Sequence, residues 1–179
     1  MAQFKAFAPG VQVNGETVLS VVAGMGAFRS RANKILEENA IANPKPGTWY
    51  AQQAWLDAFK DISELLGAHT LFAIGKSIPQ NARFPAAIRS VADALGAIDA
   101  AYHMNHRGGE IGHYVFNQNG GDSATVVCRN PYPCDFDRGL ITGTADKFKS
   151  SRTVVRVQHD DGKPCRKRGA DSCTYQVKW

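Results

Sequence analysis

The spacing of the apolar residues changes near residue 108, and this change limits the folds open to the chain. Before it, apolar residues recur three or four positions apart, which is the period of an α-helix. After it, short runs of alternating residues are typical of β-strands. No internal repeat is visible. We therefore predict a single α+β domain over residues 1–179, in which N-terminal helices (1–108) pack on a C-terminal antiparallel sheet (109–179) with one further helix between two hairpins.

Four helices are expected in the first half, and glycine and proline set their ends. The first is a long helix over residues 13–41, ended by the prolines and glycine of ANPKPGT. The second runs from Trp49 to Gly67, a suitable C-terminal stop. The third ends near Pro79, and the fourth runs from Pro85 to a double glycine.

The second half supplies the strands and the last helix. Two strands around an Asn-Gly-Gly turn are predicted from EIGHYVFNQNGGDSATVVCRN. Helical spacing returns in CDFDRGLITGTADKFK. A second pair of strands is expected in TVVRVQH and CTYQVKW, joined by DDGKPCRKRGADS.

A chain of 179 residues can bury a core without disulfides or an obligate metal. The first residues, MAQFKAFAPG, lack the pattern of a signal peptide, and no run of about 18 apolar residues could cross a membrane. We therefore expect a cytoplasmic protein without a membrane partner. In a reducing cytosol the four cysteines are expected as thiols or metal ligands rather than disulfides.

The net charge of +5 is concentrated in the C-terminal part. From Arg138 onward the chain has ten Lys and Arg residues and four Asp and Glu residues. Such a segment suits a nucleic acid or another anionic partner, but it is also typical of a solvated sheet face and its turns. We favour the solvated face and do not expect nucleic-acid binding.

The cysteines suggest a metal centre near the end of the chain. Cys165 and Cys173 bracket a turn in the last hairpin, and Cys134 is expected at the start of a helix, where a thiolate is favoured. His159 closes the strand before the turn. Zinc needs four such ligands. Reduced packing cysteines, or a disulfide in the pairing Cys165–Cys173 or Cys128–Cys134, remain alternatives.

The same region resembles the C-terminal part of the 4-vinyl reductase domain. The likeness covers residues 128–179 and is carried by PYPCDFDRGLITGTADKF, a short strand, CRKRGADSC and a closing strand. That family is related to the transport-particle (TRAPP) subunits and, more distantly, to haem-nitric-oxide-binding domains. Its phenol-sensing members hold zinc with a cysteine that opens the helix and with Glu-x2-Cys-x7-Cys in the hairpin.

The resemblance implies a zinc site in this chain. The glutamate position falls on Gly162, which cannot bind a metal, so His159 is expected as the fourth ligand and Asp161 as the second choice. The expected ligands are Cys134, Cys165, Cys173 and His159.

Folds of this family are generally dimeric with an apolar cavity between helices and sheet. The resemblance therefore implies a homodimeric domain that binds or senses a small apolar or aromatic molecule. The alternative is a dimeric scaffold or adaptor for a protein or anionic partner, without a small-molecule role. An enzyme is not expected, because no nucleophile and base can be assembled, and Asp135 and Asp137 are explained as charges favoured by a helix N-terminus.

Candidate ligand contacts are aromatic residues of the second helix and residues near the end of the fourth. They are Trp49, Tyr50, Trp55, Phe59, Tyr102, His103 and His106. Aromatic residues at helical spacing are more often core than pocket. A metal site formed by the histidines around the double glycine is not expected, because the glycines interrupt the helix. Haem is not expected either, because the Tyr-x-Ser-x-Arg pattern of haem-nitric-oxide-binding domains is absent.

Overall fold

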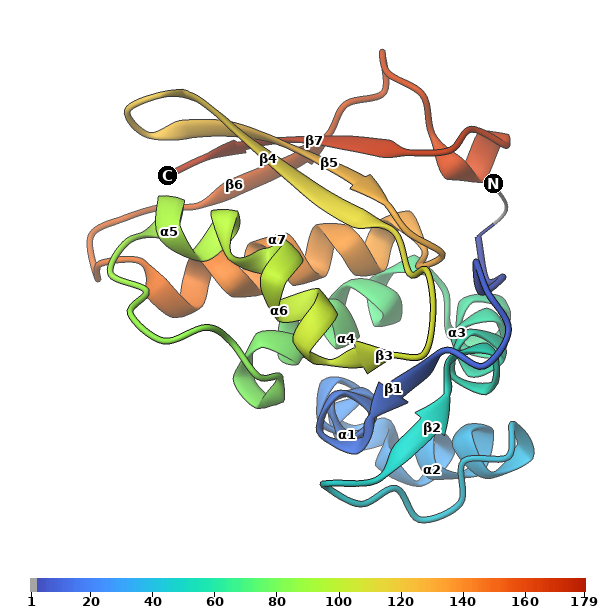
Figure 1. Cartoon of the computed structure of the whole chain (residues 1–179). Coiled ribbons are helices and arrows are strands. Elements are labelled where there is room, and N and C mark those ends of the chain that lie inside the picture. Colours follow the sequence, from blue (N-terminus) through green and yellow to red (C-terminus); the bar gives the residue numbers. More distant parts are fainter. Residues whose placement is uncertain (1–2) are drawn as a thin grey trace.

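In the computed structural model, which describes residues 3–179, a four-stranded antiparallel sheet lies across one side of the helices (Figure 1). Its strands are β4 (His113–Gly120), β5 (Ser123–Arg129), β6 (Arg156–His159) and β7 (Cys173–Lys178), in the order β4-β5-β7-β6. Each predicted hairpin is one half of this sheet. The halves meet where β5 pairs with β7 and Cys128 lies opposite Cys173.

Seven α-helices lie in the described part of the chain, and with the antiparallel sheet they confirm the predicted α+β class. They are α1 (Gly15–Gly24), α2 (Arg29–Glu38), α3 (Gln52–Leu66), α4 (Ala68–Asn81), α5 (Val91–Gly96), α6 (Ile98–Met104) and α7 (Cys134–Phe148), with 3-10 turns η1 (Gly26–Phe28) and η2 (Arg166–Arg168). Helix α7 runs beneath the sheet, between the two hairpins in sequence (Figure 1). Within residues 3–179, no helix has the length and apolarity that crossing a membrane requires.

A second, three-stranded sheet is a feature that the sequence analysis missed. It is formed by β1 (Gln12–Asn14), β2 (Trp49–Ala51) and β3 (His106–Arg107), in the order β2-β1-β3. Strands of two or three residues are too short to show an alternating pattern. Trp49 and Tyr50, expected to open a helix, therefore lie on a strand.

The first predicted helix is divided into α1, η1 and α2. Gly26 has a φ of 49°, a left-handed conformation that glycine adopts without strain and that interrupts the helix. The neighbouring Gly24 is needed for packing, because a Cβ there would lie 2.6 Å from the Cα of Ile74 in α4. Two glycines separated by one residue thus turn one predicted helix into two packed segments.

The fourth predicted helix begins later than expected and is also divided. Its start is Val91 and not Pro85, because the Ser90 side chain accepts a hydrogen bond from the main-chain N–H of Asp93 at 3.0 Å and caps α5. The chain then bends at Ala97 before α6 begins. The cap, rather than the proline, sets the boundary.

Helices α4 and α7 touch through their backbones. A Cβ on Gly139 would lie 2.1 Å from the carbonyl oxygen of Phe72, and Gly75 and Gly143 leave similarly little room. Only glycine permits this approach. The contact seats α7 firmly against the helical layer and so fixes the position of Cys134 at its N-terminus.

Candidate functional site

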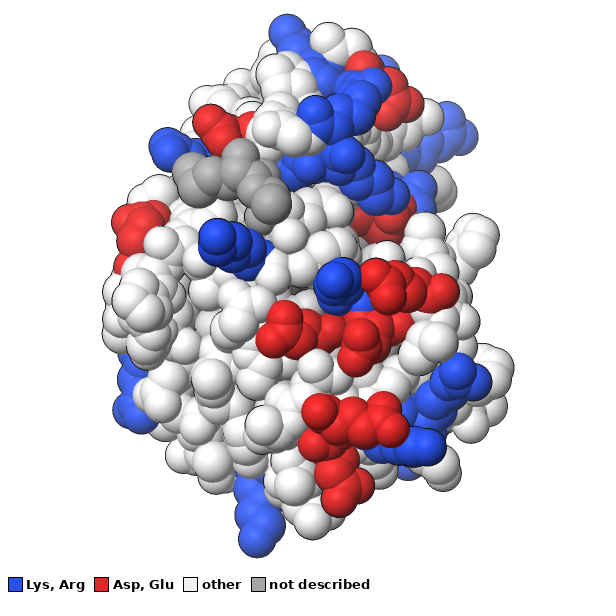
Figure 2. Space-filling view, turned by 90° about the vertical axis from the view of Figure 1, so that its right-hand side faces the viewer, with Lys and Arg blue, Asp and Glu red and all other residues white. Residues whose placement is uncertain are grey.

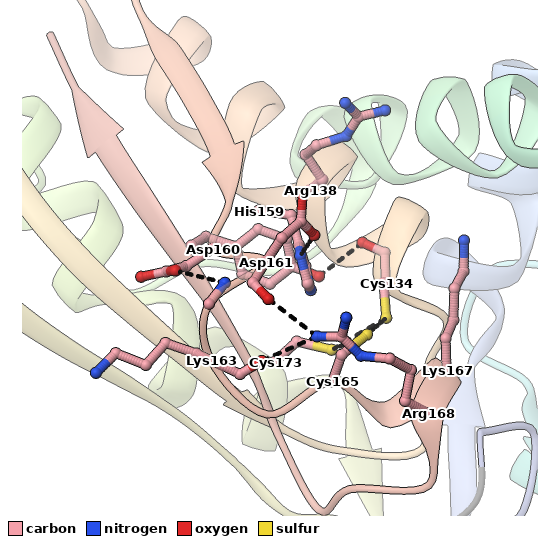
Figure 3. Close-up of polar contacts among 12 residues, drawn as sticks. Cys134, Arg138, His159, Asp160, Asp161, Lys163, Cys165, Lys167, Arg168 and Cys173 are labelled. Atoms are coloured by element: carbon pink, nitrogen blue, oxygen red, sulfur yellow. Dashed lines mark hydrogen bonds and ion pairs between the residues drawn. The ribbon is translucent and has the colours of Figure 1, made fainter.

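Three cysteines from separate elements meet beside the last two strands (Figure 3). Cys134 opens α7, Cys165 precedes η2 and Cys173 opens β7. The Sγ atom of Cys134 lies 3.0 Å from that of Cys173 and 3.6 Å from that of Cys165, and the remaining pair is 3.9 Å apart. All three side chains are buried. Sulfurs distant in sequence therefore converge at one point.

These separations suit a tetrahedral metal. Zinc–thiolate bonds are about 2.3 Å long, so two sulfurs of a tetrahedral site lie roughly 3.8 Å apart. Two of the three observed distances are close to this value, and the third, between Cys134 and Cys173, is shorter at 3.0 Å. Three thiolates and one imidazole are a common ligand set for structural zinc.

His159 is placed to supply the fourth ligand. Its donor atom and those of the three cysteines all lie within 4.8 Å of one another. Its Nδ1 lies 2.8 Å from Oδ1 of Asp161, whereas its Nε2 is buried without a hydrogen-bond partner in the described residues. An Nδ1–H donated to a carboxylate leaves the Nε2 lone pair for a metal. Asp161 thus orients the histidine in this arrangement (Figure 3).

Arg166 sets the electrostatics of the cluster. Its main-chain N–H and its Nε each donate to the sulfur of Cys173 at 3.4 Å. The contact from Cys134, together with the Arg166 cation, lowers the pKa of Cys173, and the same contact and burial raise the pKa of Cys134. These contacts favour the thiolate form of Cys173, which is the form that binds metals.

All four cysteines are free thiols in the structure, so neither alternative disulfide is present. Cys128 is buried on β5, directly across from Cys173, and lies outside the group that could hold a metal. Burial, followed by the nearby Asp137 carboxylate, raises the pKa of Cys128. This cysteine has the environment of a packing residue.

Behind the cluster, Asp137 and Arg166 form a buried ion pair. Their side chains are 0% and 1% exposed. Arg166 also donates to both carbonyl oxygens of Asn130, and the Tyr114 hydroxyl donates to Oδ1 of Asp137 at 2.6 Å. Burial raises the pKa of Asp137, and the Arg166 cation opposes this effect. Asp135 and Asp137 both lie in the first turn of α7, as expected, but the buried pairing of Asp137 with Arg166 was not foreseen. Asp135 pairs with a surface lysine.

An apolar cavity of about 40 Å³ lies between the helices and the sheet. Its walls come mainly from α1, α4, α6, β4 and α7. They include Ile78, Ile98, Tyr102, Tyr114, Tyr132 and Phe136. A water molecule takes about 30 Å³ of liquid volume, so the cavity in this form holds only a very small molecule, and a larger ligand has to displace side chains.

His106 is the histidine that lines this cavity, and it is the buried member of the five histidines. Its Nδ1 donates to the carbonyl oxygen of Tyr102 at 2.8 Å, and its Nε2 lies 2.7 Å from the Tyr132 hydroxyl, which donates to it. Burial lowers the pKa of His106 to about 4. The cavity thus contains an uncharged imidazole.

We expect protonation of His106 to make the protein less stable by about 2 kcal/mol between about pH 7.5 and pH 5. The unfolded pKa is about 6.5, and the folded pKa is about 4. Between these values the unfolded chain binds more protons. The stability from neutral His106 is therefore complete above the unfolded pKa and is lost as pH falls towards the folded pKa. Urea unfolding of wild type and His106→Asn over this range measures the difference in slope.

The exposed His69 provides the control for that experiment. His69→Asn should leave the wild-type pH slope unchanged, because this side chain lies at the surface of α4. A slope that persists in His106→Asn would show that other groups cause it.

Of the seven expected ligand contacts, Tyr102 and His106 line the cavity. Trp55 and Phe59 are core residues that pack edge to face at 4.8 Å. The other two aromatic residues lie on β2, where the Trp49 ring is covered by a surface arginine and the Tyr50 hydroxyl accepts a main-chain N–H.

His103 lies on the outer side of α6, half exposed. Its ring stacks on that of His113 with centroids 5.1 Å apart, and Asp99 lies within 3.7 Å of both rings. Helix α6 ends at Met104, before the double glycine, so no i, i+4 arrangement of these histidines with Glu110 forms, as expected. The sequence analysis did not foresee that β4 returns alongside α6 and places His113 close to Asp99 and His103.

Comparison with known proteins identifies the fold. No family model and no curated protein matches the sequence. Among solved structures, a triple mutant of an H-NOX protein from S. oneidensis in the Fe(II) state superimposes with a TM-score of 0.65 at 16% identity, covering 92% of this chain and 95% of that chain. The fold is that of H-NOX domains.

Two further structures agree with this assignment. An oxygen-binding H-NOX domain related to soluble guanylate cyclases gives a TM-score of 0.62 at 15% identity, over 92% of this chain and 94% of that chain. A structure concerned with haem redox potential and porphyrin distortion gives 0.64 at 15% identity, over 93% and 94%. At these identities the likeness establishes the H-NOX fold alone. It agrees with the haem-nitric-oxide-binding side of the expected relationship.

The expectation against haem as a cofactor was wrong. It depended on a missing sequence pattern, yet the H-NOX fold is present without that pattern, and its solved neighbours are haem proteins. The cavity matches haem in its apolar walls and its neutral imidazole, His106. It does not match in size, because the side chains as placed leave about 40 Å³, much less than a porphyrin occupies.

Proposed function

We propose that this chain is a small-molecule-sensing domain with an H-NOX fold, whose ligand lies in the cavity beside His106. The observation that carries the proposal is an apolar cavity lined in part by an uncharged, buried imidazole. Apolar walls with a few placed polar groups are typical of a small-molecule site. The expected ligand is a small apolar or aromatic molecule with a hydrogen-bonding group that replaces the Tyr132 hydroxyl at Nε2 of His106.

Binding of two probes, phenol and haemin, tests this proposal. Binding of phenol is expected to shift the NMR signals of cavity residues. Binding of haemin would give a Soret band. Ala101 is a small buried residue in the cavity wall, so Ala101→Leu should abolish binding by filling the space.

Ala100→Leu is the matched control, because Ala100 lies on the same helix and faces solvent. Binding that is lost in Ala101→Leu and kept in Ala100→Leu supports the cavity, and the probe that binds identifies the ligand class. If neither probe binds, or if both variants bind equally, the proposal fails.

We further propose that Cys134, Cys165, Cys173 and His159 hold a structural zinc ion. The spacing of the sulfurs and the unpartnered Nε2 of His159 support it. We also propose that the last hairpin is of the 4-vinyl reductase type. The ion would then connect the start of α7 to the β6–β7 connection. It would thereby fix one end of the layer that covers the cavity.

Cys165→Ser should lower zinc content and thermal stability together. Serine is a poor zinc ligand at neutral pH, and one missing thiolate leaves an incomplete tetrahedron. Elemental analysis and a thermal unfolding scan measure both quantities. Cys128→Ala is the control, because Cys128 is equally buried but lies outside the cluster. Equal zinc content in wild type and Cys165→Ser would remove Cys165 from the ligand set.

The other expectations remain predictions. Figure 2 shows Lys and Arg side chains gathered at the upper end of one face, near the β6–β7 connection. Part of this charge is neutralised within the chain, since Lys167 pairs with Asp135 at 2.6 Å. Native mass spectrometry tests the homodimer and the adaptor alternative, which predicts a dimer without a bound small molecule. The absence of catalysis and the cytoplasmic location stay predictions.

A further inference from the structure

One continuous chain of buried polar contacts joins the cavity to the cysteine cluster. Tyr114 lines the cavity, and its hydroxyl donates to Oδ1 of Asp137 at 2.6 Å. The other carboxylate oxygen, Oδ2, pairs with Arg166. Arg166 in turn donates twice to the sulfur of Cys173. All four side chains are buried, so each contact acts in a low dielectric and is strongly felt by the next.

A second branch connects the same two places. Arg166 donates to the side-chain and main-chain oxygens of Asn130. The side-chain oxygen of Asn130 also accepts the main-chain N–H of Tyr132 at 2.9 Å. The Tyr132 hydroxyl then reaches His106. Arg166 therefore belongs to both branches, one leading to Tyr114 and the other to Tyr132 and His106 in the cavity wall.

Because Cys165 directly precedes Arg166, the geometry of the cysteine cluster influences the position of Arg166. Cys165 and Arg166 are consecutive, and the turn is closed by N–H groups of Arg168 and Ala170 donating to the Cys165 carbonyl oxygen at 2.9 and 3.2 Å. A metal bound by Cys165 and Cys173 would fix the main chain on which Arg166 stands. Much of the rest of the β6–β7 connection is exposed and has little packing to hold it.

We propose that metal binding at the cysteine cluster and ligand binding in the cavity are coupled through Tyr114, Asp137, Arg166 and Cys173. This inference rests on the function proposed above and assigns its regulation. The metal-bound cluster fixes the position of Arg166, and Arg166 fixes that of the Asp137 carboxylate. Asp137 in turn fixes the Tyr114 side chain in the position that leaves room for the ligand. Coupling between two binding sites is reciprocal, so each ligand strengthens the binding of the other by the same factor.

The test measures phenol affinity with and without zinc, and zinc affinity by competition with a chelator. In wild type, zinc should tighten phenol binding several-fold. Tyr114→Phe removes only the hydroxyl that reaches Asp137. It should weaken zinc binding by no more than the roughly 10- to 100-fold typical of partners outside the ligand shell, and it should reduce the effect of zinc on phenol to what the branch through Asn130 and Tyr132 carries. Tyr50→Phe is the control, because within residues 3–179 that hydroxyl accepts a main-chain N–H, from Lys45, and is remote from the chain of contacts.

The outcomes separate the coupling from the function on which it rests. If zinc and phenol both bind but neither changes the affinity of the other, the coupling is wrong and the proposed function stands. The same conclusion follows if Tyr114→Phe behaves like Tyr50→Phe. If phenol binds but zinc does not, the coupling and the zinc site are wrong and the cavity proposal stands. If phenol does not bind wild type, the coupling is wrong, and the haemin experiment decides the cavity proposal. A change in stability alone would not alter the factor by which zinc tightens phenol binding.

Discussion

Arg166→Met is expected to lower the free energy of unfolding by about 3 to 5 kcal/mol. Methionine roughly fills the space of the arginine stem but leaves the Asp137 carboxylate buried and without its cation. The Asn130 carbonyl oxygens lose their donor at the same time. Removing one partner of a buried pair costs more than the pair contributes, because the remaining charge has no solvent. Urea denaturation with saturating zinc measures the loss.

Two variants show whether burial causes this loss. Arg166→Met combined with Asp137→Leu removes both charges and should recover a large part of the stability. Arg83→Met breaks the half-exposed Arg83–Glu16 pair, joined at 2.8 Å, and should cost no more than about 1 kcal/mol. If Arg166→Met were as mild as Arg83→Met, the buried pair would not have the importance assigned to it.

Gly139→Ala is expected to cost about 3 kcal/mol, the upper end for overpacking a core. The new methyl carbon would lie 2.1 Å from the Phe72 carbonyl oxygen, and a helix backbone cannot move aside as a side chain can. Alanine is favoured over glycine in a helix by about 1 kcal/mol, so the net loss understates the clash. Chemical denaturation of the purified variant gives the value.

Gly96→Ala is the matched control, because it also changes a helical glycine. Its added Cβ would meet the Phe116 ring at 3.5 Å, an ordinary contact. We expect unchanged or slightly higher stability. Equal losses in the two variants would mean that close approach of α4 and α7 is not what requires glycine at position 139.

The fold was predictable where a regular apolar pattern continues over many residues. The helices α3 and α7 and the two hairpins follow from apolar spacing over many residues, and Gly67 ends α3 as expected. The short sheet β2-β1-β3 was not predictable, because its strands are held by pairing between segments far apart in sequence. The division of the first helix depends on packing against α4, which no local pattern records.

The site was predictable to a similar extent. Cysteine spacing and the family resemblance indicated the ligand set that the structure brings together. The partners behind it were missed, because Asp137 and Arg166 are 29 residues apart and each has an ordinary surface explanation when taken alone. Tyr114 and Tyr132 were hidden for the same reason: which side of a strand or loop faces a cavity depends on the assembled helices.

The four residues of the proposed zinc site all belong to the stretch from Cys134 to Cys173. An ion there would crosslink only the C-terminal part of the chain, leaving the helices from α1 to α6 without a direct connection to it. Chelation should therefore increase amide hydrogen exchange in β6 and the start of β7 before it affects α3 or α4. The domain would open from one edge, and its core would unfold only under conditions harsher than those that remove the ion.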